Sequence, residues 1–141
     1  MRFALVVLLA LVLAPATMAE RSTAPTLKSG SSSYGKVLFD GRGFVLYAFT
    51  RDQRRSACYG ACAKAWPPYF APKGTLTVGA GVKKALLGTV RRTNGRRQVT
   101  YAGRPLYYYV GDTRPGQILC QDVFEYGGRW LIVRPSGKLV R

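Results

Sequence analysis

The sequence predicts an all-β domain built from two related repeats, and two observations lead to this prediction. The first is an internal repetition. Leu46–Asp52 (LYAFTRD) recurs sixty residues later as Leu106–Asp112 (LYYYVGD), and a glycine precedes each copy at the same distance. The second is local, since short runs rich in Val, Tyr, Phe and Thr alternate with Gly, Asn and Pro, which is typical of strands and tight turns. Repetition of this kind indicates one structural unit used twice.

Residues 1–19 have the features of a secretory signal. Arg2 gives a positive start, residues 3–13 form an apolar run, and Thr17–Ala19 is a small-residue cleavage site. The apolar run is too short to span a bilayer. We expect cleavage after Ala19, with Ala16 as the alternative. We also expect export to the periplasm or beyond as a soluble chain. No cysteine lies near either cleavage site to carry a lipid anchor.

The rest of the chain is expected to form one domain. Residues 20–34 are rich in Ser, Thr, Pro and Gly and predict a flexible leader. Residues 35–138 then form a single β domain, with repeats at about 36–72 and 88–136. Each repeat contains one tryptophan, which we interpret as a core anchor rather than a ligand-stacking side chain: Trp66 and Trp130.

The charge balance is strongly basic. The 22 Lys and Arg residues outnumber the 6 Asp and Glu residues, and the net charge of +16 becomes +15 when cleavage removes Arg2. This excess either serves solubility or attracts polyanions outside the cytoplasm, such as anionic envelope lipids and polymers or shed nucleic acid. No nucleic-acid-binding motif accompanies it, so sequence-specific binding of DNA or RNA is not expected.

The composition excludes several chemistries. The sequence has no His, and both Met residues lie within the signal. A Ser-His-Asp or Cys-His nucleophile is therefore impossible, as is zinc or haem held by His. We expect no enzymatic activity, no metal and no cofactor.

Residues 36–40 and 44–49 predict two strands of the first repeat. The second strand is expected to be covered on both sides, because apolar side chains occupy both of its faces. Its alternation places Tyr47 and Phe49 on one face and Leu46 and Ala48 on the other.

Two short helices are expected, one within the first repeat and one just before the second. Ser56 is placed to cap a helix over residues 57–65, which Pro67 ends. Residues 82–87 predict one or two further helical turns, closed by Gly88.

The second repeat contains the clearest hairpin. Residues 89–93 and 96–101 flank Asn94-Gly95, a pair that suits the two positive-φ positions of a type I′ turn. Residues 105–110 are expected to complete a three-stranded meander, and residues 130–134 to form the last strand.

The residues that define the repeat have two interpretations. In the structural one, each Asp accepts backbone N–H groups in the turn after its strand, and each Tyr sends its hydroxyl to that loop or carboxylate. In the functional one, the two Tyr–Asp pairs frame a shared binding groove. Catalysis by paired carboxylates is less favoured, because few acids are present. The positions are Tyr47, Phe49, Asp52, Tyr107, Tyr109 and Asp112.

Cys58 and Cys62 also have two interpretations. In an oxidising compartment such a pair predicts a structural disulfide. The alternative is a redox or copper-handling role, although the His or Met that soft-metal sites usually recruit is missing. Cys120 is left without an assigned partner.

Arginines cluster at the predicted hairpin and in one loop. Only one Arg of each hairpin pair can share a face of the alternating strands. The cluster is either a solvated hairpin end or a polyanion-binding edge. Its members are Arg91, Arg92, Arg96 and Arg97 at the hairpin, with Arg51, Arg54 and Arg55 in the loop.

The two motif copies resemble a family of secreted and lipoprotein repeats with the pattern Tyr-x-aromatic-x-x-Asp. The blocks SACYGACAKAWPP, LLGTVRRTNGRRQVTYAGRPLYYYVGDTRPGQ and RWLIVRP support the resemblance, which covers roughly residues 36–136. It implies an exported repeat domain and brings no activity with it. The chain departs from similar sequences in lacking an anchoring cysteine and in having Cys120 where they tend to have Gly. We therefore expect an exported envelope protein, acting as a non-enzymatic binding or structural module.

Overall fold

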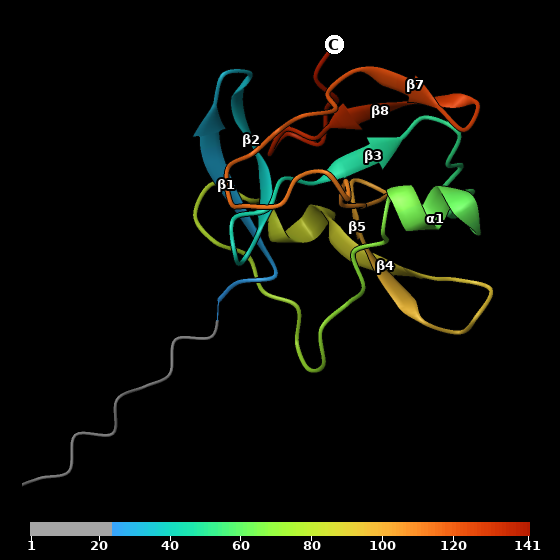
Figure 1. Ribbon diagram of the computed structural model, residues 1–141. Coiled ribbons are helices and arrows are strands. Elements are labelled where there is room, and N and C mark those ends of the chain that lie inside the picture. Colours follow the sequence, from blue (N-terminus) through green and yellow to red (C-terminus); the bar gives the residue numbers. More distant parts are fainter. Residues whose placement is uncertain (1–23) are drawn as a thin grey trace, which may run out of the picture.

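The computed structural model describes residues 24–141 and is mostly β (Figure 1). Eight strands form three antiparallel sheets. The helices of this range are short: α1 (Ala61–Ala65) and one turn of 3-10 helix, η1 (Lys84–Leu86). The predicted all-β fold is confirmed. The signal expected over residues 1–19 lies outside the described residues.

Two of the three sheets have three strands, and one has two. The hairpin of β1 and β2 stands at one side of the molecule, the β3–β8–β7 sheet lies above, and β4 and β5 lie below (Figure 1). Strand β8 is central in its sheet, as β5 is in its own. The bounds are β1 Leu27–Ser32, β2 Gly35–Asp40, β3 Tyr47–Phe49, β4 Leu87–Arg91, β5 Arg97–Tyr101, β6 Arg104–Pro105, β7 Val123–Glu125 and β8 Gly128–Ile132.

Strand β1 lies where the sequence predicted part of a flexible leader, and this prediction is wrong for residues 27–32. Residues 27–32, predicted to be flexible, pair antiparallel with β2 along their whole length. Their small Ser and Gly residues allow close packing. A Cβ at Gly30 would lie 2.9 Å from the ring of Phe39. The repeat itself carried the missing signal, because Leu27 lies sixty residues before Leu87, which begins β4 in the equivalent hairpin.

The two repeats interlock through their motif strands. Tyr47 and Tyr107 are equivalent residues, and they exchange both backbone N–H···O bonds at 2.9 Å in an antiparallel bridge. An approximate twofold axis therefore passes between them. Tyr47 also pairs with Ile132, two residues after Trp130, and Tyr107 bridges Pro68 in the equivalent position. The segment after each tryptophan thus pairs with the motif strand of the other repeat.

The motif strands separate two hydrophobic cores. Tyr47, Phe49 and Tyr107 belong to one core, whereas Leu46 and Ala48 belong to the other. The equivalent Leu106 lies in the second core as well. The prediction that this strand is covered on both faces is confirmed.

The predicted helices are shorter than expected. Helix α1 begins at Ala61 rather than at residue 57, and its N-cap is Gly60 with a φ of 57°, a conformation that favours glycine. Ser56 makes no cap; its hydroxyl accepts from the backbone N–H of Cys58 at 3.3 Å. After η1, Gly88 lies within β4 rather than closing a helix.

The hairpin turn also differs from the prediction. Gly95 has a φ of 83°, whereas Asn94 is not among the residues with positive φ. The backbone N–H of Gly95 donates to the carbonyl oxygen of Arg92 at 2.9 Å. The backbone N–H of Arg92 donates to the carbonyl oxygen of Arg96 at 2.9 Å. The loop therefore has three residues, a type I turn followed by a left-handed glycine, rather than the two-residue type I′ turn.

The strands at the end of the chain are close to those expected. The β4–β5–β6 meander is confirmed, although β6 has only two residues because the chain then turns toward the first repeat. The last strand, β8, begins at Gly128 and ends at Ile132. Strand β7, which the sequence did not predict, forms a hairpin with it.

Candidate functional site

The motif tyrosines bond across the two repeats. The Tyr47 hydroxyl donates to Asp112 Oδ2 at 2.7 Å, and the Tyr107 hydroxyl donates to Asp52 Oδ2 at 2.9 Å. Each bond joins the tyrosine of one copy to the aspartate of the other. The structural interpretation had considered only a bond within each copy.

The second oxygen of each aspartate holds the following loop. Asp52 Oδ1 accepts from the backbone N–H of Ala57 at 2.7 Å. Asp112 Oδ1 accepts from the N–H of Leu119 at 2.9 Å. Both carboxylates therefore connect a loop of their own repeat to a tyrosine of the other.

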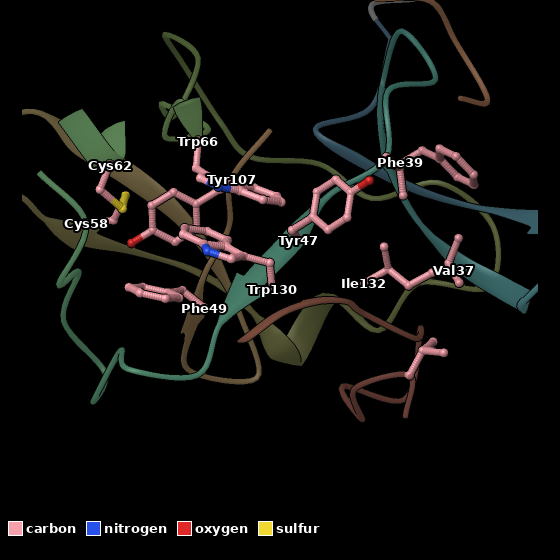
Figure 2. Packing of buried hydrophobic residues seen from close by; sticks show 12 residues of the cluster. Val37, Phe39, Tyr47, Phe49, Cys58, Cys62, Trp66, Tyr107, Trp130 and Ile132 are labelled. Atoms are coloured by element: carbon pink, nitrogen blue, oxygen red, sulfur yellow. A yellow bond between two sulfur atoms is a disulfide. The ribbon is translucent and has the colours of Figure 1, made fainter. Parts of the chain in front are cut away.

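The motif aromatics pack around the two tryptophans, again across the repeats. Trp66 stacks on Trp130 with ring centroids 4.0 Å apart and planes within 5°. Phe49 stacks on Trp130 at 4.2 Å, and Tyr109 lies 4.8 Å from Trp66. Figure 2 shows Trp66, Trp130 and Phe49 in one cluster. Both tryptophans are fully buried, as expected of core anchors.

The pKa shifts of the motif tyrosines and aspartates reflect their burial inside the protein. Burial raises the pKa of Asp52 to about 6 and raises that of Asp112 above its ordinary value. Burial also raises the pKa of Tyr47 and Tyr107, so both hydroxyls keep their protons and act as donors. Tyr47 and Tyr107 are fully buried. The four groups form two pairs, and each pair is joined by one hydrogen bond across the repeats.

The predicted bridge between Cys58 and Cys62 is confirmed. Both residues are buried beside Trp66, in the core that contains Tyr47 and Tyr107 (Figure 2). The bridge ties the segment before α1 to the helix itself. Cys120 is a free, half-buried thiol, and burial raises its pKa.

One predicted polyanion-binding residue lies inside the protein. Arg92 is 5% exposed, and it donates to Ser56 Oγ at 2.6 Å and to Gln98 Oε1 at 2.9 Å. It also donates to Cys58 O at 2.7 Å, and its guanidinium lies over the Tyr59 ring. The prediction that Arg92 belongs to an exposed polyanion-binding edge is therefore wrong. The other three hairpin arginines are exposed: Arg91, Arg96 and Arg97.

Arg92 forms part of a basic pocket that the sequence did not predict. The pocket has a volume of about 490 Å³ and lies between the loop after Asp52 and strand β4. Arginines of the loop and of the hairpin meet here, although they are far apart in the sequence. Its lining residues are Arg55, Ser56, Tyr59, Val90, Arg91, Arg92 and Thr93, none of them acidic.

The carboxylates of residues 24–141 all accept hydrogen bonds from other side chains. Asp40 accepts from Arg42 and Tyr108, and Glu125 accepts from the Trp66 indole N–H. Asp122 pairs with Arg129 at 2.8 Å. Asp52 and Asp112 accept from the two tyrosines. All five acids are therefore bonded to other groups of the protein. The described part of the chain contains no group of three or more His, Cys, Asp or Glu residues placed to hold a metal ion.

Fold and site together define a small β domain of two interlocked repeats, joined by reciprocal Tyr–Asp bonds. The chain belongs to a family described as a secreted repeat of unknown function, whose model matches it twice, over residues 28–69 and 88–134. The first match begins within β1, in agreement with the corrected start of the domain. No curated protein and no solved structure gives a significant match. Within residues 24–141 no helix has the length and apolarity needed to cross a membrane.

Proposed function

We propose that the protein is an exported, non-enzymatic envelope module that binds polyanions through the exposed arginines of its β4–β5 hairpin. The observation that carries this proposal is a difference between the acidic and the basic side chains. The acids are engaged in internal contacts, whereas Arg91, Arg96 and Arg97 are exposed at one end of one hairpin. The net charge of +15 expected after cleavage adds a long-range attraction for anions.

The geometry of the hairpin favours contact with an extended anion. Arg91 lies opposite Arg97 in the β4–β5 register, and Arg96 lies beside the turn. All three of these arginines are exposed to solvent. Arg97 is held by two hydrogen bonds to Thr89 Oγ1, at 3.0 and 2.7 Å. The hairpin thus presents guanidinium groups at defined positions.

Retention on heparin and on anionic liposomes, measured against salt concentration, tests this proposal. Replacing Arg91, Arg96 and Arg97 with Gln should weaken retention and reduce its salt slope, because fewer counterions are released. The control loses the same charge elsewhere on the exposed surface, through Lys36→Gln, Arg104→Gln and Arg114→Gln. Equal loss of retention in both variants would reject the hairpin as the binding edge.

The alternative is a redox or copper-handling role for Cys58 and Cys62. Thiol–disulfide exchange needs access of an attacking thiolate to a sulfur. Cys58 is fully buried and Cys62 is 7% exposed, so their environment favours a structural bridge.

A further inference from the structure

We propose that the pocket between the loop after Asp52 and strand β4 is a discrete binding site for a phosphate group. This inference rests on the proposed function and adds a specific subsite to it. The site is distinct from the hairpin tip, because neither Arg96 nor Arg97 lines the pocket. Three arginines line it: Arg55 and Arg91 from exposed positions and Arg92 from a buried one.

The buried arginine makes this pocket different from a solvated basic surface. Arg92 has no carboxylate within ion-pair distance among residues 24–141, and its acceptors are a hydroxyl, an amide and a backbone carbonyl. The carboxylate of Asp52 interacts with this charge only through space, behind Ser56 and the Tyr107 hydroxyl. The guanidinium therefore lacks a direct anionic partner, which favours an anion bound beside it. Three of its five N–H donors are used in these bonds, and the other two make no hydrogen bond within residues 24–141.

The protein holds this guanidinium in a fixed orientation. Ser56 and Gln98 fix Nη1, Cys58 O fixes Nη2, and the Tyr59 ring packs 4.2 Å from the guanidinium carbon. The disulfide at Cys58 restrains the segment that supplies that carbonyl. A donor fixed before binding loses little entropy on contact with an anion.

The chemistry of the lining selects a phosphate. Guanidinium groups match the oxygens of phosphate in paired hydrogen bonds, and three of the lining residues are arginines. Thr93 and Ser56 add hydroxyls, and no lining residue is acidic. The volume of about 490 Å³ leaves room for the organic part of a phosphate ester beside Tyr59 and Val90.

The test is a titration of the isotope-labelled exported protein, followed by amide NMR at constant ionic strength. One series uses inorganic phosphate, a second uses glycerol phosphate, and a third uses phosphatidylglycerol vesicles. The first two series distinguish a free phosphate from an esterified one, and the third reports a lipid headgroup. Chloride replaces phosphate in the control. The expected result is saturable shifts confined to the amides of Ser56, Tyr59, Thr93 and their neighbours.

Two variants with equal charge separate this pocket from the hairpin tip. Arg55→Gln with Arg91→Gln should weaken phosphate binding at least roughly tenfold, because each lost charge-assisted bond contributes substantially. Arg96→Gln with Arg97→Gln should leave it within about twofold while reducing heparin retention. Neither variant alters Arg92, so the buried hydrogen bonds of this arginine are kept in both.

The outcomes for the pocket and for the hairpin edge are separable. Shifts that do not saturate with any of the three ligands, or equal weakening in both variants, would overturn the phosphate site. Loss of heparin retention in the Arg96/Arg97 variant would still support the hairpin edge in that case. Saturable phosphate binding with unchanged heparin retention would instead support the pocket and reject the edge.

Discussion

The hydroxyl of Tyr47 donates to the carboxylate of Asp112, 65 residues away in the other repeat. Tyr107 and Asp52 form the reciprocal bond. Each repeat therefore completes the motif of the other, and neither keeps its tyrosine and aspartate together. This exchange explains why two similar sequences form one domain rather than two. The two tyrosine hydroxyls are bonded inside the protein, which is what the structural interpretation of the motif expects.

Asp52 should make stability depend on pH. Burial raises its pKa to about 6 in the folded protein, whereas an exposed Asp has a pKa of about 3.9. Between these values the folded state holds a proton that the unfolded state has released. The contribution of Asp52 to the free energy of unfolding should therefore fall as pH rises from about 4 to about 6.

The variant Asp52→Asn isolates this effect, because its amide does not titrate. Urea unfolding of both proteins from about pH 4 to about pH 7 should show wild type losing stability relative to the variant as pH rises. Asp112, whose pKa burial also raises, contributes in the same direction to both proteins and cancels in the comparison. Parallel curves would contradict an upward-shifted Asp52.

Adjacent arginines should differ sharply in their effect on stability. Arg92→Gln removes the donor that serves Ser56, Gln98 and Cys58 O, and unpaired buried acceptors are costly. We expect a loss of about 2–4 kcal/mol in the free energy of unfolding. Arg91→Gln, an exposed change next to it, should stay within about 0.5 kcal/mol. Chemical denaturation of both proteins provides the measurement, and equal losses would argue against the buried position of Arg92.

The disulfide should be structural. Denatured but unreduced protein should take up one iodoacetamide group, on Cys120, as measured by mass spectrometry. Replacing Cys58 and Cys62 with Ser should lower the free energy of unfolding by about 2 kcal/mol or somewhat less, because the closed loop is small. Uptake of three groups would show that the bridge is absent. Rapid reduction of the native protein by mild thiol would favour the redox alternative.

Much of the fold could be predicted from the sequence, because repetition and alternation are visible in one chain. The two-sided burial of residues 44–49 follows from apolar side chains on both faces. Strand β1 was missed because its Ser and Gly residues form a strand through backbone pairing to β2, a tertiary effect that local composition does not reveal. The type of turn at Asn94 was predicted wrongly, because Asn-Gly also occurs in three-residue loops.

The candidate site was less predictable. The sequence identifies Tyr47 and Asp112 as motif members, but it cannot assign a partner sixty-five residues away. The same limit applies to Arg92, which bonds to Ser56, 36 residues earlier in the chain. The basic pocket arises only when the loop and the hairpin meet in space. Contacts between distant segments are therefore what the structure adds.

The most direct test of the reciprocal motif is a pair of double-mutant cycles on the free energy of unfolding. One cycle combines Tyr47→Phe with Asp112→Asn, which are bonded across the repeats, and the other combines Tyr47→Phe with Asp52→Asn, which belong to one copy. The account predicts a coupling of about 1 kcal/mol or more in the first cycle and below about 0.5 kcal/mol in the second. A larger coupling between Tyr47 and Asp52 than between Tyr47 and Asp112 would contradict it.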